Sequence, residues 1–344
     1  MKKIKSILIV LLFILITASG CVKIEKGPLD GGVYKSIDGM RYWGQKMVFL
    51  SLPQENNVLD NIEVTDLVFD PQDTGTIYLS TKNNGLFVSF DAAESWEKVR
   101  RLPQGKINAV AVDPKAKHIV YVAVDSRLFR TGDANRTWEN IYLEAMPDVE
   151  ITSLAINHLF PSFVYAGLSD GRLIKSENGG ASWTSLYNFE GEIEQILINP
   201  YNVQIMYLLA KDRGIYRSED QGIKWMPLKE NYQSGNAEQI IFNQNFSDAL
   251  IMVKENGLFH TENGGRNWEE YKLVSSNRGL KICSLAIDPQ NPDVVYYATQ
   301  KTIYKSVDGG ENWTTKPLPS KRLPAKMLVD PINSNVSYLG LVNP

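Results

Sequence analysis

Short apolar runs recur along the chain, and turn residues separate them at regular intervals. The first kind of run closes on Asp or Asn, usually followed by Pro, as in Val64 to Asp70 before Pro71. A second kind is centred eight residues after that Asp or Asn, on an aromatic or β-branched residue. The central residues are Tyr78, Tyr121, Tyr165, Tyr207, Ile251, Tyr296 and Tyr338. Runs of this composition between turns predict paired β-strands.

An eight-residue pattern follows these two strands and ends at each of the seven tryptophans. It opens with Ser or Thr, has Asp or Asn at its third position, and successive copies start 53, 42, 45, 42, 43 and 45 residues apart. The third and eighth residues are Asp38 and Trp43, Asp91 and Trp96, Asp133 and Trp138, Asn178 and Trp183, Asp220 and Trp225, Asn263 and Trp268, and Asp308 and Trp313. Short polar side chains at such positions accept hydrogen bonds from turn N–H groups. We therefore expect hairpin turns in which the acids are structural and the tryptophans pack.

Four strands in each of seven repeats predict an all-β fold, a seven-bladed β-propeller. The first repeat lacks its first two strands, and the last repeat lacks its eight-residue pattern. We expect these two halves, residues 31–50 and 324–344, to pair in one blade. Such pairing closes the ring and removes the open sheet edges. Residues 31–344 then form a single domain.

The eight-residue pattern, for example Ser306 to Trp313, resembles the Asp-box or BNR repeat of the sialidase-like propellers. With its preceding strands it covers residues 31–344 and resembles three groups of proteins. These are single-propeller lipoproteins related to the photosystem II assembly and stability factor, sortilin-type ten-bladed receptors, and xyloglucanases built from two seven-bladed propellers. One ring of seven favours the first group. The resemblance implies the fold and leaves the ligand open, because one fold serves many functions.

Residues 1–20 have the pattern of a cleaved secretory signal. Three lysines precede a run of ten apolar residues from Ile7 to Ile16, which is too short to span a bilayer comfortably. Small residues then lead into Cys21, which resembles the bacterial lipobox and implies acylation of this cysteine. We expect a tether over residues 21–30 and a bacterial membrane-anchored lipoprotein on the extracytoplasmic side. The alternative is an ordinary cleaved signal with Cys21 as an unmodified thiol.

The composition excludes several classes of function. The 344 residues are 43% hydrophobic and 22% charged, as in an ordinary globular chain. The net charge of −3 becomes −6 without residues 1–20, since 33 Lys and Arg then face 39 Asp and Glu, and no basic excess argues for nucleic acid. Two cysteines and three histidines argue against a disulfide framework and a zinc site, so we expect no metal and no cofactor.

The sequence offers little catalytic chemistry. Arg101-Leu102-Pro103 resembles a sialidase motif, yet Arg322-Leu323-Pro324 repeats it at the equivalent loop, which favours loop geometry. Cys283 is expected to be a buried small hydrophobe of an innermost strand, and His260 a packed or surface residue. We therefore predict a monomeric, non-catalytic protein-binding or assembly scaffold. The alternative is a carbohydrate-active enzyme or glycan-binding lectin, and an enzyme should place two or three acids together at the channel mouth.

The loops between blades are the expected partner-binding surface, because they vary while the Asp-Pro turns and Asp-boxes are constrained. Cations gather on one side of this surface, which we call the basic sector. They are Arg100, Arg101, Lys106, Arg127, Lys321 and Arg322, with Lys316 and Lys326 nearby. The longest of these loops, residues 51–61, lies between them, and acids such as Glu144 and Glu192 lie opposite. We predict that the basic sector docks an unidentified protein partner, such as a membrane protein or an acidic segment.

Overall fold

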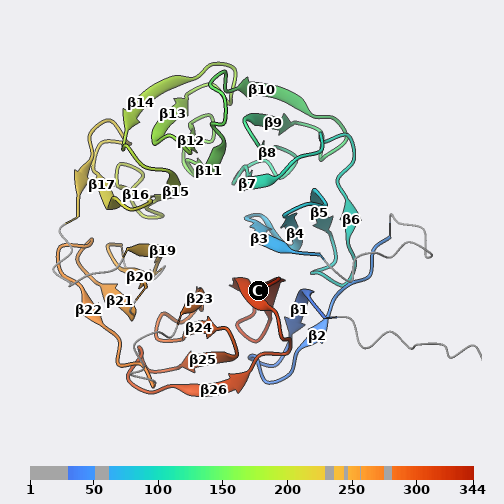
Figure 1. The fold of residues 1–344 in the computed structure, drawn as a ribbon, viewed down its shortest axis with the longest axis vertical. Helices are drawn as coiled ribbons and strands as arrows, with labels where there is room; N and C mark the ends of the chain where they lie inside the picture. Colours follow the sequence, from blue (N-terminus) through green and yellow to red (C-terminus); the bar gives the residue numbers. More distant parts are fainter. Residues whose placement is uncertain (1–29, 51–61, 229–235, 244–246, 256, 275–280) are drawn as a thin grey trace, which may run out of the picture.

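The computed structural model describes residues 30–50, 62–228, 236–243, 247–255, 257–274 and 281–344. These residues form seven four-stranded antiparallel sheets, arranged as blades around a central axis (Figure 1). The arrangement is a seven-bladed β-propeller, which confirms the predicted fold class. The part of the chain that the structure describes contains no helix long and apolar enough to cross a membrane.

Each blade is built outward from the axis through four strands (Figure 1). The innermost strands are β3 (Val64–Asp70), β7 (Ile107–Val112), β11 (Ile151–Ile156), β15 (Ile193–Ile198), β19 (Ala237–Phe242), β23 (Ile282–Ile287) and β27 (Leu323–Val329). The second strands are β4 (Asp73–Thr81), β8 (Val120–Val124), β12 (Val164–Leu168), β16 (Met206–Ala210), β20 (Leu250–Lys254), β24 (Val295–Thr299) and β28 (Ser337–Val342). The third strands are β5 (Leu86–Ser89), β9 (Arg127–Thr131), β13 (Arg172–Ser176), β17 (Gly214–Ser218), β21 (Gly257–Thr261), β25 (Thr302–Ser306) and β1 (Gly32–Ser36). The outermost strands are β6 (Glu97–Lys98), β10 (Glu139–Leu143), β14 (Thr184–Asn188), β18 (Met226–Pro227), β22 (Glu269–Glu270), β26 (Thr314–Pro317) and β2 (Gly44–Gln45).

The two ends of the chain close the ring in one blade. We number the blades from 1, which holds β3 to β6, to 7, which joins β27 and β28 to β1 and β2. In blade 7, β1 pairs with β28 over five residue pairs, which confirms the predicted closure. Residues 46–50 then reach blade 1, where Trp96 N–H donates to Val48 O (2.8 Å) and Leu50 N–H donates to Trp96 O (3.0 Å). Blades 7 and 1 are thus joined at the rim as well as near the axis.

Seven clusters of buried apolar side chains fill the seven interfaces between neighbouring blades. Between blades 7 and 1, for example, Val33 and Tyr338 pack with Val64 and Leu79. The second strands contribute most, and every residue of β8, β12, β16, β20 and β24 is buried. A neighbouring blade covers each face of these strands, which explains their continuous rather than alternating apolar pattern.

A β-bulge interrupts every innermost strand near its first residue. The bulged residues are Thr65, Asn108, Thr152, Glu194, Glu238, Cys283 and Ala325. A bulge leaves its extra residue outside the ladder and bends the strand. The expectation that Cys283 is buried is therefore corrected, because the bulge leaves its side chain half-buried. Burial still raises the pKa of the Cys283 thiol.

Polar contacts also join the second strands of blades 1, 2 and 3 to the Asp-box of the next blade. The Tyr121 hydroxyl donates to Gly179 O (3.1 Å), and the Tyr165 hydroxyl donates to Gln221 O (3.2 Å). A cation from the third strand lies over the tyrosine ring at 5.2–5.9 Å in five blades. The pairs are Lys35–Tyr338, Arg130–Tyr121, Lys175–Tyr165, Arg217–Tyr207 and Lys305–Tyr296. The recurrent tyrosines therefore stabilise the ring.

Candidate functional site

The polar side chains of each Asp-box form hydrogen bonds within their own turn. In each of the seven boxes, the Ser or Thr hydroxyl accepts from the N–H of the fifth residue at 2.8–3.2 Å. The side-chain oxygen of the third residue accepts from the N–H of the seventh at 2.8–3.0 Å. Hydrogen bonds from the Thr137 hydroxyl and backbone lower the pKa of Asp133 to about 2. Acids in this state hold turns together and are poorly suited to proton transfer near neutral pH.

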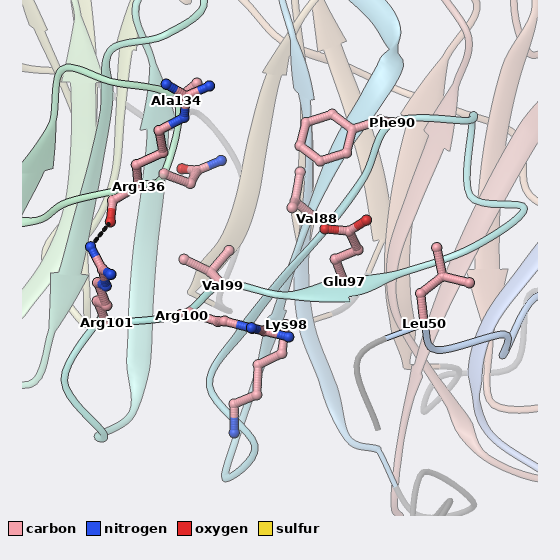
Figure 2. Close-up of a pocket in the computed structure, with 11 residues that line it drawn as sticks. Leu50, Val88, Phe90, Glu97, Lys98, Val99, Arg100, Arg101, Ala134 and Arg136 are labelled. Atoms are coloured by element: carbon pink, nitrogen blue, oxygen red, sulfur yellow. Dashed lines mark hydrogen bonds between the residues drawn. The ribbon is translucent and has the colours of Figure 1, made fainter. Parts of the chain in front are cut away.

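A groove of about 580 Å³ opens at the outer rim between blades 1 and 2 (Figure 2). Its apolar lining includes Val88 and Val99, which are buried, and Leu50 and Phe90, which are 63% and 58% exposed. Strand β6, at the rim of blade 1, has two residues, whereas β10 of blade 2 has five. The short strand leaves apolar surface of blade 1 open to solvent beside the Asp-box of blade 2.

Three exposed arginines, Arg100, Arg101 and Arg136, line this apolar surface, and we call the site the arginine groove. The Arg101 guanidinium donates to Arg136 O (3.3 Å), which ties the two walls together (Figure 2). Arg101 has a φ of 62°, a left-handed conformation that costs a non-glycine residue roughly 1 kcal/mol or more. Glu97 adds one negative charge to the lining. Guanidinium groups beside an apolar floor suit a ligand that carries a carboxylate next to an apolar group.

The structure places the first four cations of the basic sector in different surroundings. Arg100 and Arg101 line the arginine groove. Lys106 forms an ion pair with Glu150 at 3.0 Å and so links blades 2 and 3. Arg127 is half-buried and lies over the aromatic ring of a residue in its own strand, at 5.4 Å. The groove thus contains two of these four residues.

Lys321 and Arg322 lie in the connection between blades 6 and 7 and differ in exposure. Lys321 is exposed, and its backbone N–H donates to Asp30 (3.4 Å). Arg322 is 8% exposed, and its guanidinium lies against Gly31 and donates to Ile62 O (3.5 Å). Arg322 therefore joins Gly31, directly before β1, to blade 1 and is not presented to solvent with the other cations.

Of the three arginines in the groove, Arg136 is the one that the sequence did not single out. It is the sixth residue of an Asp-box, a position that was assigned to turn geometry. The equivalent positions hold residues as different as Ala181 and Ile223, and this variation is the available signal. The division into a constrained box face and a variable loop face was too coarse, because the arginine groove includes a box turn. Cys21 and residues 51–61 lie outside the described residues.

Acidic residues gather where the innermost strands of blades 4 and 5 begin. Glu194 and Glu238 are the bulged residues of β15 and β19. Burial raises the pKa of Glu194, and the charges of Glu192, Asp212 and Glu238 raise it further against the opposing effect of Lys211. A carboxyl group with a raised pKa near a second carboxylate resembles the pair used in glycoside hydrolysis. Across the described ranges, no three His, Cys, Asp or Glu side chains form a group that could hold a metal ion.

Sequence comparisons relate the chain to sorting receptors and to xyloglucanases. The profile of the Sortilin-Vps10 family, described as sortilin, neurotensin receptor 3, matches residues 171–277. An oligoxyloglucan-reducing end-specific xyloglucanase of Emericella nidulans is 22% identical over 301 residues, covering 69% of this chain and 36% of that protein. A vacuolar protein sorting/targeting protein 10 of Fusarium vanettenii is 33% identical over 93 residues, or 27% of this chain and 6% of that protein. The chain spans less than two fifths of the length of these relatives.

Solved structures with the same fold include proteins of two kinds. YCF48 from Cyanidioschyzon merolae has a TM-score of 0.64 at 19% identity, covering 82% of this chain and 96% of that chain. A structure of YCF48 bound to D1 peptide has a TM-score of 0.65 at 17% identity, covering 90% and 98%. The GH74 xyloglucanase from Xanthomonas campestris has a TM-score of 0.69 at 19% identity, covering 82% and 51%. At these identities the likeness establishes the fold alone.

Proposed function

We propose that this chain is a lipid-anchored extracytoplasmic propeller that binds a polypeptide and acts as a non-catalytic scaffold. The arginine groove carries the proposal. An extended segment with an acidic residue beside an apolar one satisfies both of its features, since guanidinium groups bind carboxylates and the exposed apolar floor gains by burial. The YCF48 structure with D1 peptide supports peptide binding by a single ring, because its chain is matched over nearly its whole length.

Peptide binding can be tested with an array of extended peptides that place Asp or Glu next to Leu or Phe. The variant Arg100→Glu/Arg101→Glu/Arg136→Glu is expected to bind them at least about tenfold more weakly than the wild type, a loss of about 1.4 kcal/mol. A matched control, Arg41→Glu/Lys224→Glu/Arg266→Glu, makes the same charge change at three other Asp-boxes and should bind like the wild type. Equal binding by the two variants, at unchanged melting temperature, contradicts the assignment of the groove.

Anchoring is tested separately. Cys21→Ser is expected to leave the chain without an acyl group and outside the membrane fraction, because the lipobox-like segment supplies the proposed anchor. Metabolic labelling with a fatty acid and fractionation of cells measure the two effects. A variant that sediments with membranes as strongly as the wild type contradicts the lipoprotein assignment.

A second candidate, a xyloglucan-active enzyme or lectin, is favoured by the acids where the innermost strands of blades 4 and 5 begin. Glu194 and Glu238 could act as acid and base, and the GH74 xyloglucanase shares the fold over about half of its chain. Release of reducing ends from xyloglucan oligosaccharides tests this candidate. Our scaffold proposal predicts no release by the wild type. Release that is lost in Glu194→Gln would instead establish the enzyme.

A further inference from the structure

Each blade ends on one side of the ring in the loop that leads to the next blade, and we call this side the inter-blade-loop face. Four exposed lysines lie on this face in blades 6 and 7. They are Lys281, Lys301, Lys316 and Lys321, and we call them the lysine patch. No ion pair joins them to any other residue that the structure describes. Their neighbour Lys326, by contrast, pairs with Asp66 at 3.0 Å. The lysine patch is therefore the part of this cationic surface whose charge the ring does not neutralise.

The lysine patch follows the edge of blade 6 from the axis to the rim. Lys281 directly precedes the innermost strand β23, Lys301 lies between β24 and β25, and Lys316 lies on the outermost strand β26 (Figure 1). Lys321 lies in the connection to β27. Leu318 N–H donates to Lys301 O (2.9 Å), which holds two of these loops together. Residues 316–326 contain no acid.

The ring begins at this same place. The Asp30 carboxylate accepts hydrogen bonds from the Ser320 hydroxyl and from Lys321 N–H. Strand β1 runs from here to Ser36, where the Asp-box opens, so Asp30 lies on the inter-blade-loop face. Residues 22–30 can span at most about 30 Å when fully extended. An acyl group on Cys21 would therefore keep the lysine patch within about 30 Å of the bilayer.

We infer that the lysine patch docks on the phosphate headgroups of anionic lipids and orients the ring with its Asp-boxes away from the membrane. The inference rests on the proposed lipid anchor. Lysine ammonium groups are compact charges on flexible stems, so they bind a fluid anionic surface without a fixed geometry. The acyl anchor supplies the attachment, and a basic patch beside it adds an electrostatic attraction to the anionic surface that can orient the ring. The acids Glu192 and Glu238, over blades 4 and 5, would tilt that side away from the lipid.

Lysine footprinting of the mature lipoprotein tests this orientation. The protein is placed on vesicles of phosphatidylcholine, or of equal parts phosphatidylcholine and phosphatidylglycerol, and acetylated with a water-soluble reagent. Lysines of the patch are expected to react several-fold more slowly on the anionic vesicles, and high salt should remove the difference by screening. Lys117 and Lys224, near the Asp-Pro turns and Asp-boxes, should react equally on both.

Charge reversal tests whether the lysine charges themselves cause the slower acetylation on anionic vesicles. In Lys281→Glu/Lys301→Glu/Lys321→Glu, the remaining Lys316 should react equally on both vesicles. The control Arg41→Glu/Lys224→Glu/Arg266→Glu should keep Lys316 protected. Equal protection on neutral vesicles, or protection that requires an added peptide, overturns the inference and assigns the patch elsewhere. Failure of the anchor is distinct, because the protein would then remain in the supernatant of both vesicle types, and the inference would fall with it.

Discussion

At the scale of single residues, hydrogen bonds within the turn lower the pKa of Asp-box carboxylates such as Asp133. The pKa of Asp133 is lowered to about 2 by donors within its own turn, whereas Asn178 makes the equivalent backbone contact in blade 3 without a charge. A carboxyl group whose folded-state pKa is depressed stabilises the protein above its unfolded pKa, near 4, and loses this contribution as the pH falls toward 2. The boxes therefore contribute to acid unfolding.

Asp133→Asn tests this linkage. The wild type should exceed the variant in unfolding free energy by a margin that is constant above pH 5 and shrinks as the pH falls from about 4 to about 2. Urea unfolding over this pH range measures the margin. Asn178→Asp is the reciprocal variant, and its unfolding free energy relative to the wild type should fall as the pH falls from about 4 to about 2. A margin that does not change with pH would show that the carboxylate charge has no part in the turn.

The tryptophans differ in burial, and their truncations should differ in cost. Trp96 is 0% exposed and donates from Nε1 to Lys46 O (3.1 Å), so Trp96→Ala should lower the unfolding free energy by about 3–5 kcal/mol. Trp183 is half-buried, and Trp183→Ala should cost less. Denaturant unfolding compares the two variants. Equal costs would contradict the packing difference between these boxes.

Residue types that recur in most repeats could be assigned from the sequence, because repetition shows that they stabilise the blade. The Asp-box turn around Asp133 and the tyrosine at Tyr165 are of this kind. Arg136 and Glu194 stand at positions whose residue type varies between blades, so no repeated pattern separates them from ordinary surface residues. Arg322 was misplaced for a related reason, because its burial depends on Gly31 at the other end of the chain. Such contacts follow from closure of the ring and cannot be read from local spacing.

At the scale of elements, strand order and closure were predictable because each blade is assembled mainly from local hairpins. The bulges were not predicted, since a register shift depends on the paired strand as well as on local sequence. They set Glu194, Glu238 and Cys283 outside the strand ladder, near the start of the innermost strands. The two-residue β6 was likewise not foreseen, and it leaves the arginine groove open.

Closure gives the sharpest prediction at this scale. Deletion of Leu323–Pro344 removes β27 and β28, uncovers an edge of β1 and opens the apolar interfaces with blades 6 and 1. We expect aggregation and loss of cooperative unfolding. Deletion of Asn343 and Pro344 alone, which are exposed, is the matched control and should unfold like the full chain. A soluble longer deletion with the wild-type melting temperature would contradict closure by this blade.

At the scale of the whole molecule, the proposed functions belong to three separate surfaces. The lysine patch lies beside the start of the ring, the arginine groove lies at the rim of blades 1 and 2, and the acids lie over blades 4 and 5. An anchor at the inter-blade-loop face would leave the rim accessible to a segment of another protein. Phe90 and Arg136, which line the groove from two neighbouring boxes, lie at its end away from the proposed membrane contact (Figure 2).

Photo-crosslinking from the arginine groove tests the central claim, polypeptide binding at this site, most directly. A photoreactive phenylalanine is placed at Phe90, which is 58% exposed, and, as the control, at Ile223, which is 62% exposed in the Asp-box of blade 4. The acidic-apolar peptides of the array serve as the probe. We predict a crosslinked peptide from position 90 that disappears at high salt and in the Arg100→Glu/Arg101→Glu/Arg136→Glu variant, and none from position 223. Equal crosslinking from both positions, or none from position 90, would contradict the account.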